Sequence, residues 1–190
     1  MSKSKTNNIT IPHGSLVLMC GAPNSGKTTF TQKHFKNKKN IDVFCSDELF
    51  MKAMKNSTIF DTFEKLQYKT EHELVKGILE GAEKGNTVVL DSVSCTPDLR
   101  NVNITAFREY FKNIVLIVLD LDIKDLLSHG TKPMTPEKIR FNLFPPNSKQ
   151  CSFIAMGLKS QIASGEIGEG VDLLHIITSE NLNNVEIVIA

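Results

Sequence analysis

Residues 16–29 of the chain read LVLMCGAPNSGKTT. The first five are apolar, which is typical of a short strand buried on both faces of a parallel sheet. Residues 21–28 then fit the pattern G-x-x-x-x-G-K-[ST] at every position and lead into a helix-length stretch over residues 27–35. A strand, a glycine-rich turn and a helix in this order predict a loop that holds a chain of phosphates with backbone N–H groups and a helix N-terminus.

The motif assigns a role to each of its polar residues. Lys27 is expected to reach the terminal phosphates of a nucleotide, and the Thr28 hydroxyl is expected to join the shell of a Mg²⁺ ion. ATP and Mg²⁺ are therefore the predicted cofactors, with Thr28 as the metal residue. The residues expected to contact the nucleotide are Gly21, Ala22, Pro23, Asn24, Ser25, Gly26, Lys27, Thr28 and Thr29.

The rest of the chain alternates apolar runs with helix-length stretches. The further strands are predicted over 41–45, 87–90, 114–119 and 174–177, with a weaker candidate at 186–189. The predicted helices cover 27–35, 63–84, 97–111 and 148–163. This alternation is typical of an α/β fold with a mostly parallel sheet of about five strands and helices on both faces.

One segment departs from the alternation. Residues 130–146 contain four prolines, and Thr135 followed by Pro136 resembles the start of a short helix. We predict a small lid near 130–146, a mobile tail over 1–10, and a single domain over 11–190. His129, Lys132, Lys138 and Arg140 are the lid cations that could close over phosphates, although surface lysines usually have no such role.

Composition excludes several classes of protein. The 190 residues are 41% hydrophobic and 23% charged, and the formal net charge of +1 gives no general attraction to a polyanion. The four cysteines are widely spaced, which favours neither a zinc site nor a disulfide framework and predicts reduced thiols in the cytoplasm. The sequence has no apolar run long enough to cross a membrane.

Two carboxylates follow predicted strands. Asp47 comes directly after the strand at 41–45, where it could accept the proton of an attacking hydroxyl or could simply cap the next helix. Asp91 ends the strand at 87–90, as expected of an acid that holds Mg²⁺ or orients its water, and a helix-capping or turn role is the alternative. Both should lie at the carboxyl edge of the sheet, which is the ligand-binding edge of such folds.

The order of these blocks resembles the P-loop polynucleotide kinase family, in particular the kinase domain of bacteriophage polynucleotide kinase-phosphatase. The matching blocks are Gly21 to Thr28, Ser46-Asp47-Glu48, Asp91 to Arg100, Gly130 to Pro133, and Thr135 to Arg140. The resemblance implies a P-loop kinase fold and ATP-dependent transfer of the γ-phosphate to a polynucleotide 5′-hydroxyl. It also implies that Asp47 is the general base and that Asp91 supports the active site.

On these grounds, Lys27, Asp47, Asp91 and Arg140 are the predicted catalytic residues, and His129, Lys132 and Arg140 are the predicted lid residues. Two positions depart from the family, which has arginines where this chain has Phe50 and His129. Neither residue replaces the bidentate phosphate contact of an arginine. Weak activity on 5′-hydroxyl oligonucleotides with strong salt dependence is therefore expected.

Three functions remain open at this point. The first is a polynucleotide 5′-hydroxyl kinase, whose partners would be a nucleoside triphosphate and a nucleic acid with a 5′-hydroxyl end. The second is a kinase for a small molecule such as a nucleoside, nucleotide or sugar, which the loss of an arginine at Phe50 favours. The third is a nucleotide-binding regulatory module with little transfer activity, which the missing lid arginine at His129 favours.

Overall fold

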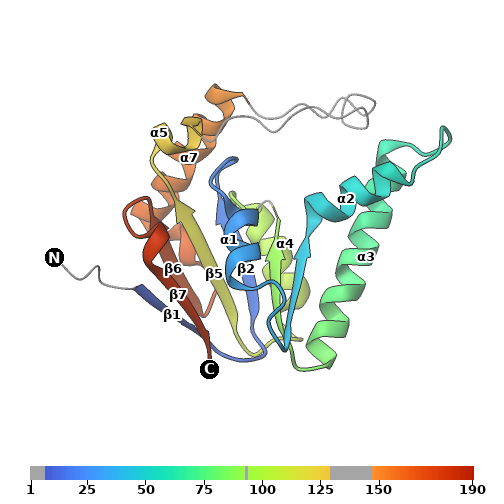
Figure 1. The fold of residues 1–190 in the computed structure, drawn as a ribbon, viewed down its shortest axis with the longest axis horizontal. Coiled ribbons are helices and arrows are strands. Elements are labelled where there is room, and N and C mark those ends of the chain that lie inside the picture. The colour runs from blue at the N-terminus through green and yellow to red at the C-terminus, as the bar shows by residue number, and fades with distance from the viewer. Residues whose placement is uncertain (1–6, 93, 129–146) are drawn as a thin grey trace.

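Five parallel strands form the central sheet, in the order β3-β4-β2-β5-β6 (Figure 1). The computed structural model describes residues 7–92, 94–128 and 147–190. The strands of the sheet are β2 (Leu16–Gly21), β3 (Ile41–Cys45), β4 (Thr87–Asp91), β5 (Ile114–Asp120) and β6 (Leu173–Thr178). The predicted α/β class and the five-stranded parallel sheet are thereby confirmed.

The helices connect successive strands as expected of a parallel sheet. They are α1 (Lys27–His34), α2 (Ser46–Lys55), α3 (Phe63–Glu83), α4 (Pro97–Phe107), α5 (Ile123–Ser128) and α7 (Ser148–Ser164), with short 3₁₀ turns at Glu166–Gly168 and Leu182–Asn184. Helices α2 and α5 have no counterpart among the predicted ranges. Helix α4 begins as its sequence suggests, since the Thr96 side chain accepts a hydrogen bond from the Leu99 N–H and Pro97 is the first helical residue.

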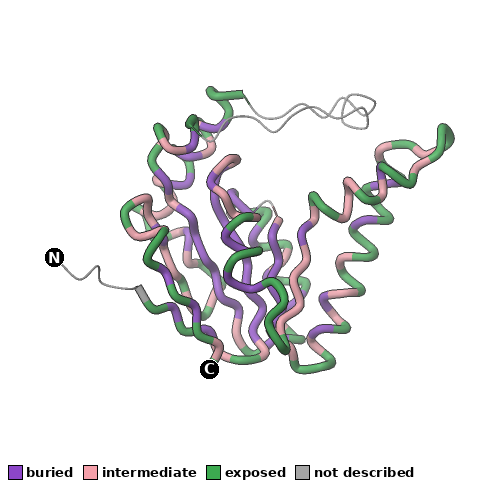
Figure 2. The backbone as a smooth tube through the Cα atoms, in the orientation of Figure 1, coloured by how far each residue is buried: buried purple, intermediate pink, exposed green. Residues whose placement is uncertain are grey.

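Alternating residues of each central strand face two separate hydrophobic cores. In β2, Leu16 and Leu18 pack into the core that includes residues of α3, α4 and α7. Val17 and Met19 pack into the other core, which includes residues of α1 and of the outer strands β1 and β7. All six residues of β2 are buried, and the tube in Figure 2 shows the central strands as the most enclosed part of the molecule.

The outer strands correct the prediction for the N-terminus. Strand β1 (Asn7–Ile11) pairs in parallel with β7 (Val185–Ile189), and the pair forms a second, two-stranded sheet. Ile9 and Ile11 are buried in the core, so residues 7–10 are ordered structure and the predicted tail over 1–10 is wrong there. Residues 186–189 do form a strand, but it belongs to this second sheet. The predicted lid over 130–146 lies outside the described residues.

Replacement by alanine is expected to change the free energy of unfolding in opposite directions at two helical glycines. Gly81 of α3 packs on β4, and a Cβ there would lie 2.6 Å from Cγ2 of the fully buried Val88 and 3.0 Å from Oδ2 of Asp42. Gly81→Ala should therefore lower the free energy of unfolding by about 1–3 kcal/mol through overpacking. A Cβ on Gly157 of α7 meets nothing within 4 Å. Gly157→Ala should raise the free energy of unfolding by about 0.5–1 kcal/mol.

Urea unfolding of the two variants beside the wild-type chain tests this pair of expectations. A stabilising effect of Gly81→Ala would show that α3 can move away from β4 at no cost. Such a result would contradict the close packing described above.

Candidate active site

The phosphate-binding motif lies where the central strand β2 ends and α1 begins. Gly21 has no room for a side chain, because a Cβ there would lie 2.6 Å from Ser25 Oγ and 3.2 Å from the Leu119 carbonyl oxygen. Gly26 has a positive φ of 80°, which favours glycine, and its backbone leads into the first turn of α1. The first turn of α1 contains no acidic residue. Its N-terminal N–H groups therefore favour an anion such as a phosphate.

Lys27 lies over this loop. Its Nζ donates hydrogen bonds to the carbonyl oxygens of Gly21 at 2.7 Å and of Ala22 at 3.3 Å. The ammonium group is thus held at the same loop whose backbone N–H groups would surround a phosphate chain. This geometry suits a lysine that neutralises the terminal phosphates of a nucleotide.

A pocket of about 210 Å³ brings together residues from four elements next to the loop. Its lining includes Thr28 of α1, Cys45 and Glu48 at the junction of β3 and α2, and Asp91 at the end of β4. Asp91 pairs in register with Cys45 of β3 and with Met19 of β2, so the sheet itself fixes its position. Two of the predicted site residues, Thr28 and Asp91, therefore share one pocket.

The chemistry of Asp91 fits a bound Mg²⁺ ion. The residue is only 4% exposed, and its Oδ2 atom has no hydrogen-bond partner among the described residues. A buried carboxylate oxygen that lacks a partner is costly unless a ligand completes it. Within the described ranges, no group of three or more His, Cys, Asp or Glu residues could hold a metal alone. Mg²⁺ is commonly held by one or two protein carboxylates together with waters and substrate phosphates, so the arrangement suits that ion.

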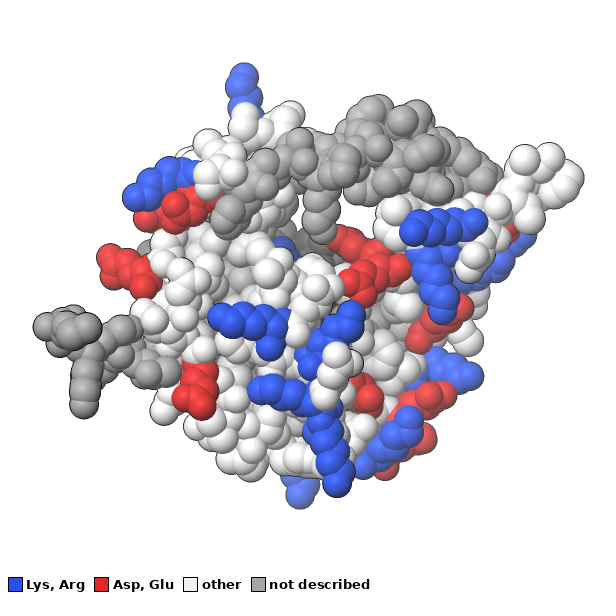
Figure 3. Space-filling model, in the orientation of Figure 1, with Lys and Arg blue, Asp and Glu red and all other residues white. Residues whose placement is uncertain are grey.

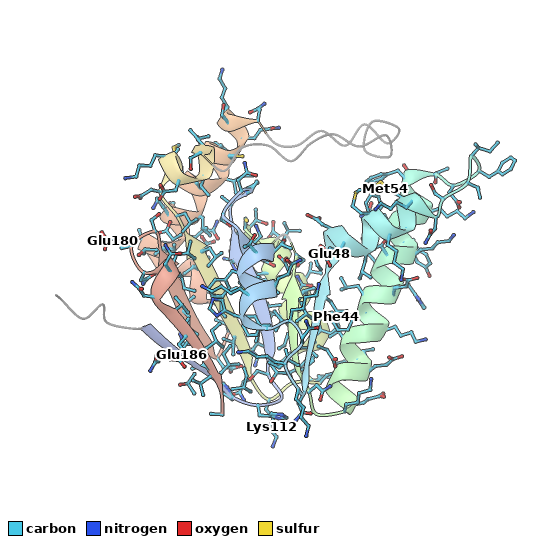
Figure 4. All side chains as sticks on the ribbon, in the orientation of Figure 1. Phe44, Glu48, Met54, Lys112, Glu180 and Glu186 are labelled. Atoms are coloured by element: carbon cyan, nitrogen blue, oxygen red, sulfur yellow. The ribbon has the colours of Figure 1, made fainter. Side chains whose placement is uncertain are left out.

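The first turn of α2 carries two more carboxylates at this edge. Asp47 and Glu48 are both exposed, and Glu48 Oε1 accepts a hydrogen bond from Nε2 of Gln32 at 3.0 Å, which links α2 to α1. Figure 4 labels Glu48 at the start of α2, between that helix and α1. Asp47 does not line the pocket that holds Thr28 and Asp91. Sequence reasoning included Asp47 among the site residues and left Glu48 out, although the two are adjacent.

The pKa of the Cys45 thiol indicates that negative charge is concentrated where β3 meets α2. Burial, followed by the charges of Asp91, Asp47 and Glu48, raises the pKa of Cys45 to about 11. All three carboxylates therefore act on the same point between β3 and β4. Such a concentration of negative charge favours a cation beside the phosphate-binding loop.

Residues that follow β4 form hydrogen bonds with the phosphate-binding loop and with the end of β2. They were not among the site residues predicted from the sequence. The Cys95 thiol donates to the Gly21 carbonyl at 2.9 Å, and the Cys20 thiol donates to the Ser94 carbonyl at 3.1 Å. The guanidinium of Arg100, which is only 2% exposed, also donates to Ser94. The sequence offered two signals: Cys20 precedes Gly21, and Cys95 and Arg100 belong to the block from Asp91 to Arg100 that resembles the polynucleotide kinases.

Three of the predicted site residues, His129, Lys132 and Arg140, lie outside the described residues. Phe50, where the sequence resemblance leads us to expect an arginine, contacts Phe63 of α3 edge to face, with ring centroids 5.3 Å apart. Its ring therefore helps to join α2 to α3.

None of the described helices is long and apolar enough to cross a membrane.

Comparisons with known proteins agree with this architecture. A chain of the Pnkp1/Rnl/Hen1 RNA repair complex is 16% identical, with a TM-score of 0.59, and the match covers 86% of this chain and 49% of that one. The chain therefore spans about half the length of that structural relative. The tunicamycin resistance protein of Deinococcus radiodurans is 8% identical, with a TM-score of 0.50 and coverage of 90% and 88%. At these identities the likeness shows the fold alone.

The comparison with curated proteins finds no significant match. The family model described as "AAA domain" (AAA_33) matches residues 16–129, which span the sheet from β2 to β5 with the phosphate-binding loop and the pocket beside it. The chain therefore belongs to this AAA domain family of P-loop kinases.

Proposed function

We propose that the chain transfers the γ-phosphate of ATP to the 5′-hydroxyl end of a polynucleotide. The observation that supports the transfer reaction is the pocket lined by Thr28 and the buried Asp91, whose Oδ2 has no hydrogen-bond partner among the described residues. Lys27 is adjacent to Thr28 in the phosphate-binding loop, and two carboxylates lie at the start of α2. Phosphoryl transfer needs a positioned phosphate chain, a cation and a proton acceptor near the attacking hydroxyl. Residues suited to all three tasks meet at one edge of the sheet.

In this proposal, Asp47 accepts the proton of the acceptor hydroxyl as the acceptor oxygen bonds to the γ-phosphorus. The bond from the γ-phosphorus to the bridging oxygen breaks, and ADP leaves with that oxygen. Lys27 and the N–H groups of residues 21–28 stabilise the charge that develops on the phosphate oxygens. Positioning and charge stabilisation account for most of the catalysis in reactions of this kind.

Thr28 and Asp91 are the residues that would hold Mg²⁺, Thr28 through its hydroxyl and Asp91 directly or through a water. When bound, the ion neutralises charge on the phosphates. The buried position of Asp91 keeps its carboxylate in one place, because the neighbouring strands pair on both sides of it.

The polynucleotide acceptor is the finer part of the proposal. Its support is the likeness of the sequence blocks to polynucleotide kinases and the likeness of the fold to a chain of an RNA repair complex. A small acceptor is the second candidate. It is favoured by Phe50, whose ring packs against Phe63 where the related kinases offer an arginine to an acceptor phosphate.

The acceptor is tested with γ-labelled ATP, Mg²⁺ and a panel of single-stranded 5′-hydroxyl oligonucleotides, nucleosides and sugars. Label should enter the oligonucleotides, and the apparent KM for them should rise steeply with salt, because lysines act as point charges that counterions screen. Good turnover of a free nucleoside, with no labelled oligonucleotide at any salt concentration, would move the assignment to the small-molecule candidate.

A further inference from the structure

Helices α2 and α3 form a hairpin whose outer part projects from the body of the protein beside the candidate active site, whereas the C-terminal half of α3 packs on the sheet (Figure 1). Its interior is apolar, with Met54 and Leu66 buried and the Phe50 and Phe63 rings in contact. Figure 4 labels Met54 near the outer end of α2. The hairpin is therefore a packed unit that carries exposed residues on its outer surface.

Charge is divided along this hairpin. Residues 52–69, its outer part, contain four lysines and two acids, whereas residues 70–83 contain one lysine and four acids. The lysines of the outer part are exposed, and they are Lys52, Lys55, Lys65 and Lys69. Lys52 and Lys69 come from different helices and line the same pocket, together with Asp61 and Glu73, and Lys69 pairs with Asp61 at 3.7 Å. Blue side chains gather over this part of the surface in Figure 3.

Large apolar side chains lie among these lysines. Ile59 is 85% exposed, Phe60 81% and Tyr68 71%. Tyr68 lies three residues after Lys65 on α3, so the two side chains share one face of that helix. An exposed aromatic ring beside lysines is the combination that single-stranded nucleic acids bind, through stacking on the ring and attraction to the phosphates.

The tip that carries Ile59 and Phe60 is held in a defined shape. The Asp61 carboxylate accepts hydrogen bonds from the Thr58 N–H at 2.9 Å and the Thr58 hydroxyl at 3.0 Å, and it pairs with Lys65 at 2.9 Å. The hydrogen bond from the Thr58 N–H and the Lys65 ammonium lower the pKa of Asp61, so the carboxylate stays ionised at neutral pH. This turn holds the apolar tip in place even though its side chains face solvent.

We propose that the outer part of the α2–α3 hairpin, residues 52–69, binds the acceptor strand of a single-stranded nucleic acid a few nucleotides away from the 5′ end. The inference rests on the proposed function, because Asp47 at the inner end of α2 marks the reacting end of the strand. Lys52 and Lys55 follow Asp47 by five and eight positions, which is about 7.5 Å and about 12 Å along a helix. At about 3.4 Å per nucleotide of a stacked strand, the hairpin contacts would begin about two to four nucleotides from the 5′ end.

The test measures binding of fluorescent 5′-hydroxyl oligonucleotides of about a dozen nucleotides by anisotropy, together with phosphorylation of the same strands and of a dinucleotide. In Lys52→Gln/Lys55→Gln the slope of log affinity against log salt should become shallower by about 1.4, for two lost contacts on a single strand. Phe60→Ala should weaken binding of the long strand by about 5-fold or more through lost stacking. The rate with the dinucleotide should not change in either variant.

Matched controls come from loops at the amino ends of the strands, opposite the carboxyl ends where the candidate site lies. Lys38→Gln/Lys39→Gln removes the same charge from an exposed pair after α1, and Tyr110→Ala removes a ring that is 56% exposed after α4. Both controls should bind like the wild-type chain. Equal losses in the controls, an unchanged salt slope in the lysine variant, or a loss that is the same for the dinucleotide would each overturn the inference.

Failure of the proposed function is distinguishable from failure of this inference. If the wild-type chain binds the long strand through the hairpin but phosphorylates no oligonucleotide, the nucleic-acid-binding surface is supported and the polynucleotide acceptor is ruled out. If the wild-type chain binds no oligonucleotide at all, the surface is not a nucleic-acid site, and the inference is overturned whatever the acceptor is.

Discussion

Replacement of Lys27 by alanine is expected to lower the rate of phosphoryl transfer by about 10²-fold or more. Among the described residues, Lys27 Nζ donates hydrogen bonds to the carbonyl oxygens of Gly21 and Ala22, which belong to its own loop. Its charge is therefore available to the terminal phosphates, and loss of such electrostatic stabilisation commonly has an effect of this size. Turnover with labelled ATP, measured beside the free energy of unfolding, checks this expectation.

Lys33→Ala on the last turn of the same helix is the matched control, because it removes an equal charge from α1 at the end remote from the loop. It should retain wild-type turnover. Undiminished transfer by Lys27→Ala would remove the loop from the mechanism. Equal losses in the two variants would instead indicate a general effect of charge on α1.

Replacement of Asp47 by asparagine is expected to lower kcat by about 10²- to 10⁴-fold, the usual range for loss of a general base. Asparagine keeps the size of the side chain and its ability to accept a hydrogen bond, so α2 should begin at the same residue. Binding of ATP and Mg²⁺ should persist, because Asp47 lies outside the pocket that Thr28 and Asp91 line. Single-turnover transfer and a separate nucleotide-binding measurement distinguish the two effects.

Glu48→Gln is the informative partner of this variant. Glu48 is adjacent in sequence, lines the pocket and accepts a hydrogen bond from Gln32, which glutamine can also do. A modest effect in Glu48→Gln beside a large one in Asp47→Asn supports Asp47 as the base. A larger loss in Glu48→Gln would assign that role to Glu48, and joint loss of binding and transfer in Asp47→Asn would make Asp47 a structural or metal-binding residue.

The parts of the fold that could be predicted from sequence are those decided by local patterns. The run over 16–20 is apolar throughout because β2 lies in the middle of the sheet with a core on each face. The glycines of 21–28 fix the turn that follows, since one leaves no space for a Cβ and the other has a positive φ. The positions of this strand, loop and helix could therefore be predicted from the sequence alone.

Other features depend on contacts between distant segments, which the sequence does not display. Residues 7–10 look polar and unpatterned, yet β1 forms because β7 supplies a parallel partner from the far end of the chain. The contact of Cys95 with Gly21 depends on β2 and β4 being neighbours, although β3 lies between them in sequence. The pocket has the same origin, since pairing of β3 with β4 brings Cys45 to Asp91.

The most direct test of the proposed reaction is the transfer of γ-labelled phosphate to one single-stranded oligonucleotide prepared in two forms, with a 5′-hydroxyl and with a 5′-phosphate. We expect Mg²⁺-dependent labelling of the 5′-hydroxyl form alone, with the label removable by a phosphatase and located at the terminal nucleotide. Equal labelling of both forms, label elsewhere in the strand, or no labelling while ATP is bound tightly would contradict the assignment of this chain as a polynucleotide 5′-hydroxyl kinase.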